Sequence, residues 1–207
     1  MKIKICGMKN AENIHQILAL QPDWMGFIFY PFSPRNVEED LASEIQDLDW
    51  RHTNRVGVFV ESDLPFILRK AELFNLNWIQ LHGKYELSLI KELRQQFKII
   101  KAIPVATTYD IHASEAYQDE VDMFLFDTKS ALHGGSGQRF DWSVLDAYKG
   151  ETSFLLSGGL SPECLKDLMH FEHPAFKGID LNSGFELSPG IKDKSSLDSF
   201  ISNLKFV

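Results

Sequence analysis

Five short apolar segments of this sequence each end on residues that can carry out acid–base chemistry or bind a ligand. Cys6 ends one segment, His82 another and Asp127 a third, while polar and glycine-rich turns at 157–159 and 180–184 follow the last two. Reactive groups at the ends of hydrophobic strands are typical of a closed parallel barrel, in which the active site lies at the carboxyl-terminal face. The pattern therefore predicts an enzyme.

Cys6 and Asp127 are candidates for a general base and a general acid. Gly7 lets a ligand approach the backbone next to Cys6, and a helix expected from Asn10 would favour a thiolate through its dipole. A modest fall from the ordinary thiol pKa of about 8.5 would make Cys6 a usable base. A partly desolvated Asp127 would keep its proton and act as an acid. The alternatives are a small buried hydrophobe and a solvated loop carboxylate.

Glycines that follow the last two expected strands predict a phosphate site. Gly158 and Gly159 precede a helix expected from Ser161, and Ser183 and Gly184 follow the eighth strand. Such turns expose N–H groups at helix starts, with no Cβ in the way of an anion. The alternative is a pair of turns that only need positive φ angles.

Two further strand-end residues, Arg35 and His82, are candidate substrate contacts. Pro34 stiffens the loop of Arg35, which suits a clamp for a carboxylate, and His82 is either a ligand contact or a capping histidine. No His, Asp and Glu cluster has the spacing of metal ligands. The glycines at 134–137 do not open a helix with the dinucleotide fingerprint. We therefore expect neither a metal nor a nucleotide cofactor.

These residues lie on an alternation of expected strands and helices, which predicts an α/β fold with a parallel sheet covered by helices. Closing eight strands gives a (βα)8 TIM barrel, expected here as a single domain over residues 1–207. An open doubly wound sheet is the alternative. The expected strands are Lys2–Cys6, Trp24–Phe29, Arg55–Val60, Trp78–His82, Ile99–Ile103, Asp122–Asp127, Ser153–Leu156 and Gly178–Asn182. The expected helices are Asn10–Leu20, one through Leu41 and Ile45, Leu64–Phe74, Tyr85–Phe97, Tyr109–Tyr117, Trp142–Ala147, Ser161–Met169 and Ser195–Leu204, with a glycine-rich loop at Thr128–Phe140.

Composition narrows the classes of partner. The 207 residues carry a net charge of -8, without a basic stripe, so nucleic acid is not an expected partner. No apolar stretch approaches the length of a membrane span, and no apolar signal segment precedes the first strand. Cys6 and Cys164 are too few for a disulfide framework and suit a reducing compartment. We therefore expect a cytoplasmic protein that does not bind membranes.

Taken in order, the motifs resemble the phosphoribosylanthranilate isomerase family of tryptophan biosynthesis from end to end. The resemblance implies that Cys6 is the general base and Asp127 the general acid. It also implies that Arg35, His82 and Asp180 lie on the anthranilate side, with Gly158, Gly159, Ser183 and Gly184 on the phosphate. Two departures are Ser157, where alanine is expected, and Lys84-Tyr85. The matching segments are Lys4-Ile5-Cys6-Gly7, Gly26-Phe27-Ile28-Phe29, Ser33-Pro34-Arg35, Val56-Gly57-Val58-Phe59, Gln80-Leu81-His82-Gly83, Phe126-Asp127-Thr128-Lys129, Gly135-Ser136-Gly137, Phe140-Asp141-Trp142, Ser157-Gly158-Gly159-Leu160 and Asp180-Leu181-Asn182-Ser183-Gly184-Phe185-Glu186.

The resemblance implies an Amadori rearrangement of N-(5-phosphoribosyl)anthranilate, with that small molecule as the partner and with no cofactor or metal. It is compatible with a monomer or a homodimer. Another phosphosugar barrel enzyme is one alternative, but such enzymes use an early-strand lysine or paired aspartates that this chain lacks at the matching places. A non-catalytic barrel that binds a partner is the other alternative, and it would be marked by loss of Cys6 or Asp127, both of which are present.

Overall fold

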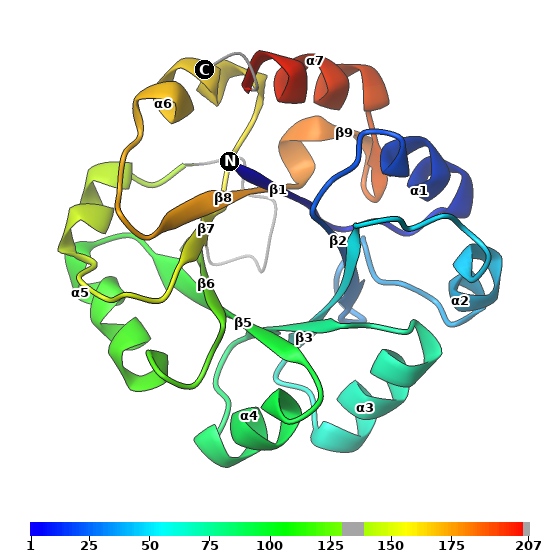
Figure 1. Ribbon diagram of the computed structural model, residues 1–207, viewed down its shortest axis with the longest axis horizontal. Coiled ribbons are helices and arrows are strands. Elements are labelled where there is room, and N and C mark those ends of the chain that lie inside the picture. Colours follow the sequence, from blue (N-terminus) through cyan, green and yellow to red (C-terminus); the bar gives the residue numbers. More distant parts are fainter. Residues whose placement is uncertain (130–138, 205–207) are drawn as a thin grey trace.

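Eight parallel strands close into a barrel in chain order, with β8 pairing with β1 (Figure 1). The computed structural model describes residues 1–129 and 139–204, so most of the predicted glycine-rich loop at 128–140 lies outside the described residues. The predicted barrel is confirmed, and the open-sheet alternative is wrong. The strands are β1 (Lys2–Ile5), β2 (Trp24–Phe29), β3 (Asn54–Val60), β4 (Trp78–His82), β5 (Lys98–Val105), β6 (Met123–Thr128), β7 (Phe154–Leu156) and β8 (Phe176–Leu181).

The strands bury both faces, as their apolar sequences require. On β1, Ile3 and Ile5 join the large core shared with the helices, whereas Lys4 points to the other side, into the barrel. A second, separate apolar cluster includes Trp24, Val56, Met123 and Leu155, which alternate with residues of the large core. Because these residues lie near the starts of their strands, the second cluster fills the amino-terminal end of the barrel.

Helices form a ring around the barrel (Figure 1). Side chains cap the first and third helices: Asn10 accepts from the N–H of Asn13, and Asp63 accepts from that of Phe66. Three predicted helices are wholly or partly 3-10 turns. The α-helices are α1 (Ala11–Leu18), α2 (Asp40–Ile45), α3 (Leu64–Leu73), α4 (Leu87–Arg94), α5 (Thr108–Ile111), α6 (Leu165–His170) and α7 (Lys194–Leu204), and the 3-10 helices are η1 (His112–Tyr117), η2 (Trp142–Ala147), η3 (Pro162–Cys164) and η4 (Ser183–Phe185). Within the described ranges, none of these helices has the length and apolar character needed to cross a membrane.

The segment between β8 and α7 contains structure that the sequence did not predict. After η4, the short strands β9 (Glu186–Ser188) and β10 (Ile191–Lys192) form an antiparallel hairpin. The side chain of Asn13 in α1 accepts from the backbone N–H of Lys192 at 2.8 Å and donates to its carbonyl at 3.0 Å. These bonds hold the hairpin beside α1, where β9 is seen in Figure 1.

Candidate active site

The carboxyl-terminal end of the barrel contains a buried charged cluster around β1 and β8. Lys4 and Asp180 are register partners on these neighbouring strands, and Lys4 Nζ lies 2.9 Å from Asp180 Oδ1. Both side chains are at least 95% buried. Ser157, which follows β7, donates from its hydroxyl to Asp180 Oδ2 at 3.5 Å. The structure therefore brings the predicted residue Asp180 together with Lys4, which the sequence analysis did not single out.

Cys6 follows β1 directly and is only 3% exposed. Burial raises the pKa of its thiol above the ordinary value, while the positive charges of Lys4 and Lys192 act to lower it. The expected depression of this pKa by the first helix is therefore wrong. The reason is distance and desolvation: α1 begins only at Ala11, several residues away, whereas the sulfur itself is shielded from water.

Asp127 lies on β6 and has the properties expected of a general acid. Burial, and next the negative charge of Asp180, raise the pKa of Asp127 to about 6. Its Oδ1 accepts from the N–H of Thr128 at 2.9 Å, which fixes the orientation of the carboxyl group. A raised pKa keeps a usable fraction of the protonated form near neutral pH.

The glycine loops after β7 and β8 lie against one another. Gly158 and Gly159 have φ angles of +86° and +64°, as the turn interpretation expected. A Cβ on Gly158 would come 2.8 Å from Asp127 Oδ1, so this loop passes directly beside the candidate acid. Gly184 does not have a positive φ, so the alternative interpretation, a turn that needs a positive φ, is wrong for this glycine. It is needed because a Cβ there would collide with the carbonyl oxygen of Leu160.

Arg35 is the predicted carboxylate clamp, but in this structure it already holds a carboxylate of the protein. Its Nε and Nη2 donate to Glu186, with Nε–Oε1 at 2.9 Å and Nη2–Oε2 at 2.6 Å. Lys192 Nζ also donates to Glu186 Oε1 at 2.6 Å and to Asn182 Oδ1 at 2.8 Å. Within residues 1–129 and 139–204, the second guanidinium nitrogen, Nη1, has no hydrogen-bond partner. Sequence reasoning missed Glu186 and Lys192, although Glu186 closes one of the quoted motifs.

His82 ends β4, as predicted, and its Nε2 lies 2.6 Å from Gln80 Nε2. The backbone on either side of His82 is held by Lys101, whose Nζ donates to the carbonyls of Leu81 at 3.4 Å and Gly83 at 2.9 Å. Burial lowers the pKa of Lys101 to about 8. Lys101 is thus a supporting residue of this loop, and it was not predicted from the sequence.

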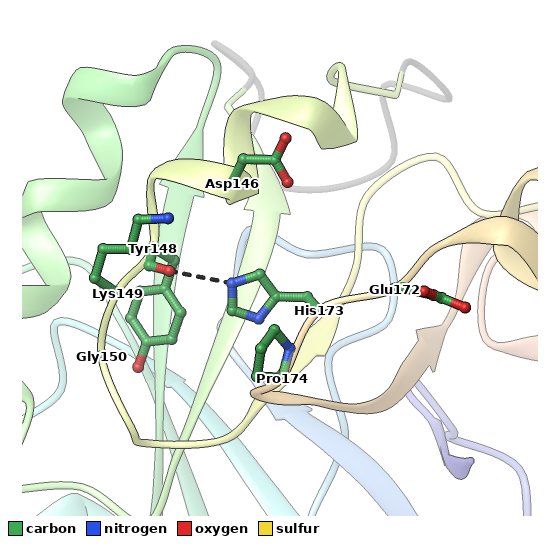
Figure 2. A pocket seen from close by; sticks show the side chains of 7 residues that line it. All are labelled: Asp146, Tyr148, Lys149, Gly150, Glu172, His173 and Pro174. Carbon is green, nitrogen blue, oxygen red and sulfur yellow. Dashed lines mark hydrogen bonds between the residues drawn. The ribbon is translucent and has the colours of Figure 1, made fainter.

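A cavity of about 350 Å³ lies away from this site, and Figure 2 shows the residues that line it. It is lined by segments that precede β7 and β8, including Tyr148 and His173. His173 Nδ1 accepts from the N–H of Ala175, so Nε2 carries the proton and donates to the Tyr148 carbonyl at 3.1 Å. None of the predicted site residues lines this cavity. In the part of the chain that the structure describes, no group of three or more His, Cys, Asp or Glu side chains is arranged to hold a metal.

Known proteins share both this sequence pattern and this architecture. The sequence model of the N-(5'phosphoribosyl)anthranilate (PRA) isomerase family matches residues 3–203. The N-(5'-phosphoribosyl)anthranilate isomerase of Parabacteroides distasonis is 45% identical over 206 residues, which cover 99% of this chain and 93% of that protein.

Solved structures agree with this match. The phosphoribosyl anthranilate isomerase of Thermotoga maritima superposes with a TM-score of 0.86 at 34% identity, covering 100% of both chains. A phosphoribosyl anthranilate isomerase in complex with reduced 1-(o-carboxyphenylamino)-1-deoxyribulose 5-phosphate superposes with a TM-score of 0.84 at 32% identity, again over 100% of both chains. The chain therefore belongs to the N-(5'-phosphoribosyl)anthranilate isomerase family.

Proposed function

We propose that this protein converts N-(5-phosphoribosyl)anthranilate into 1-(2-carboxyphenylamino)-1-deoxyribulose 5-phosphate, the isomerase step of tryptophan biosynthesis. The observation that supports the catalytic roles of particular residues is the raised pKa of Asp127, a carboxyl group on β6 whose pKa is about 6. It lies beside the glycine loop of β7 and in the same barrel mouth as the Cys6 thiol. A carboxyl group that can donate a proton and a thiol that can accept one are the two groups that an acid–base isomerase needs.

The two groups act in sequence on the sugar. Asp127 gives its proton to the ring oxygen as the C1–O bond breaks, and the nitrogen lone pair forms a Schiff base at C1. Cys6, as a thiolate, then takes the proton from C2, and the electrons of that C–H bond form the C1–C2 double bond. The resulting enolamine tautomerises to the ketone. The iminium nitrogen already accepts the electrons, so the chain's own residues need only move protons.

The substrate carries two anionic groups, and the mouth offers a place for each. We assign the phosphate to the backbone amides of Gly158, Gly159, Ser183 and Gly184, where the loops after β7 and β8 meet. We assign the anthranilate carboxylate to Arg35 through Nη1, the guanidinium nitrogen that Glu186 does not use.

His82 and Asp180 remain expected on the anthranilate side, although both oxygens of Asp180 are already bonded within the protein, to Lys4 and Ser157. Three cations of the mouth, Lys4, Arg35 and Lys192, form ion pairs with the two carboxylates Asp180 and Glu186.

The activity is tested with purified protein and phosphoribosylanthranilate, by following the loss of substrate fluorescence. Cys6→Ser should be severely impaired, because a hydroxyl is rarely ionised at neutral pH. Cys164→Ser is the matched control, since Cys164 is the other buried free thiol. Absence of turnover by the parent protein would contradict the function, and equal activity of the parent and Cys6→Ser would contradict only the role of Cys6.

Location and assembly remain part of the proposal. Cys6 and Cys164 are free thiols, which supports a reducing compartment such as the cytoplasm. One related structure is described as generated monomers of the dimeric enzyme of Thermotoga maritima. Either a monomer or a homodimer is compatible with a site that this single chain supplies.

A further inference from the structure

Lys4 is a fully buried cation for which the acid–base scheme gives no role. Its side chain has 0% exposure inside the barrel, and its Nζ bonds to Asp180 Oδ1 at 2.9 Å. Removing an ammonium and a carboxylate from water is costly, and an apolar pair of similar volume often stabilises a fold as well as a buried ion pair does. A buried pair in this place therefore calls for a functional explanation.

The side chain of Lys4 lies close to the Cys6 thiol as well as to Asp180. Cys6 directly follows β1 and lies two positions after Lys4, so both side chains point into the barrel. The ammonium group and the thiol interact through charge. Although burial acts to lower it, the charge of Asp180 and next that of Cys6 raise the pKa of Lys4 above its ordinary value. The lysine is thus held as an ammonium group beside the sulfur.

Gly26 on the neighbouring strand keeps this contact open. A Cβ at Gly26 would come 2.8 Å from Cys6 Sγ and 3.2 Å from Lys4 Nζ. The backbone there is fixed, because the carbonyl of Gly26 accepts from the N–H groups of Gly7 and Met8 at 2.9 and 3.1 Å. Any side chain on this residue would press against both the sulfur and the ammonium.

The charged groups that act on Cys6 come from three elements. Lys4 on β1 and Lys192 on β10 stabilise a thiolate, and Asp180 on β8 opposes it. Lys192 donates to Glu186 and Asn182, so its charge is largely balanced by Glu186. Of the two cations, Lys4 has the larger effect of charge on the thiol.

We propose that Lys4 is the positioning residue of the general base: its ammonium, oriented by Asp180, is the counterion that stabilises the Cys6 thiolate. The inference rests on the proposed role of Cys6. During turnover the proton from C2 ends on sulfur and Lys4 keeps all of its protons, so it acts through Cys6. Asp180 then has a second task besides any contact with substrate, since it keeps Lys4 charged and aimed at the sulfur.

The test is a pH titration of the thiolate by its ultraviolet absorbance, with Cys6→Ser subtracted as the blank. The variants are Lys4→Met and the double variant Lys4→Met/Asp180→Asn. The double variant removes both members of the ion pair and so protects the fold against an unpaired buried carboxylate. We expect the midpoint of the Cys6 titration to rise by about one pH unit or more in Lys4→Met. In the double variant the rise should be smaller, because Asp180→Asn also removes a charge that opposes the thiolate. An unchanged midpoint in the folded double variant would overturn the proposal.

Kinetics supply a second readout that a purely structural lysine would not change. The acidic limb of the kcat/KM profile should move to higher pH by the same amount as the thiol midpoint, with little change in KM. Asp180→Asn alone removes a charge that opposes the thiolate but also the partner that orients Lys4, so the thiol midpoint should rise less than in Lys4→Met. A rise larger than that in Lys4→Met would assign the effect to Asp180 and overturn the role of Lys4. The two proposals can be contradicted separately. High activity of Cys6→Ser would contradict the role of Cys6 as the base, whereas the thiol titration would still report on Lys4. A thiol midpoint that does not change in the Lys4 variants would contradict only the role of Lys4.

Discussion

The two ends of the barrel interior are built from the same strands but from opposite kinds of side chain. Near the strand starts, the packing is apolar, and Trp24 meets Trp78 edge to face with ring centroids 5.6 Å apart. Near the strand ends, Lys4, Asp180 and Cys6 are buried together as polar and charged groups. The contrast indicates that the apolar end stabilises the folded state, whereas the charged end holds reactive groups in place at a cost in stability.

The largest effect expected from this contrast is the loss of turnover in Asp127→Asn. The amide keeps the shape and can still accept from the N–H of Thr128, but it cannot donate the proton needed for ring opening. We expect kcat to fall by about 10²–10⁴-fold, the usual contribution of a general acid. Steady-state kinetics measure the loss, and circular dichroism checks the fold. A kcat within a few-fold of the parent would remove Asp127 from the acid role.

The next effect concerns the other end of the barrel, through Leu155→Ala. Leu155 is fully buried in the apolar cluster, and deleting its side chain should lower the free energy of unfolding by about 2–5 kcal/mol. Urea unfolding measures this change. Because the space left by the deleted side chain lies in the apolar cluster and not in the charged cluster, kcat and KM of the folded variant should stay near those of the parent. A large fall in kcat would show that the two ends are coupled, which breaks the comparison.

A smaller effect is expected at the phosphate loops, through Gly158→Val. The branched side chain would meet Asp127 and Thr128 and would be strained at a φ of +86°. We expect KM for the substrate to rise by about tenfold or more, which is about 1.4 kcal/mol of lost binding. Gly190→Ala is the control, because Gly190 has a similar φ of +87° in the β9–β10 turn, where an added Cβ would meet the flexible side chain of Lys9 and no residue of the phosphate loops.

The location of the anion gives an independent check on that prediction. A crystal soaked with phosphate should show the anion against Gly158, Gly159, Ser183 and Gly184. An anion bound only beside Lys129 and Arg139 would contradict the phosphate assignment while leaving the acid and base roles in place.

The smallest effect is a gain in stability from Asp127→Asn at neutral pH. The pKa of Asp127 is about 6 in the folded state, above the ordinary value of about 4, so the folded state binds the extra proton between these pH values. The contribution of this group to stability is fully present below about pH 4 and is lost as pH rises through about 6. The free energy of unfolding of Asp127→Asn should therefore exceed that of the parent by on the order of 1 kcal/mol near pH 7, a value reduced for the partial exposure of this residue. Near pH 4 the two proteins should have nearly the same free energy of unfolding. Urea unfolding at both pH values tests this, and an equal difference at both would contradict it.

The sequence predicted the barrel because its strands are uninterrupted apolar runs whose ends are marked by polar residues. Trp24–Phe29 and Trp78–His82 agree with the structure at both bounds. The β9–β10 hairpin was missed because strands of three and two residues carry no readable periodicity.

The candidate site was predictable as residue types but not as interactions. The alternation Lys4-Ile5-Cys6 already places Lys4 and Cys6 on one face of a strand, and this signal could have revealed the lysine. The partner of Arg35 could not be found in this way, because Glu186 lies 151 positions further along the chain. The direction of the pKa shift of Cys6 was predicted wrongly, because the prediction considered the dipole of the next helix and did not include the effect of burial on the thiol pKa.

The ion pair between Lys4 and Asp180 also constrains how the protein folds. The two residues are separated by 176 positions, so a chain still being synthesised holds β1 without its partner strand. Contacts of such sequence separation are made late, because a long segment must first be ordered. Ring closure, in which β8 docks beside β1, then brings Asp180 to Lys4 and completes the surroundings of Cys6 at the same moment. Partly folded forms should therefore be inactive. During refolding, the rate at which activity returns should match the rate at which β8 docks beside β1, and it should be slower than the rise in helical content.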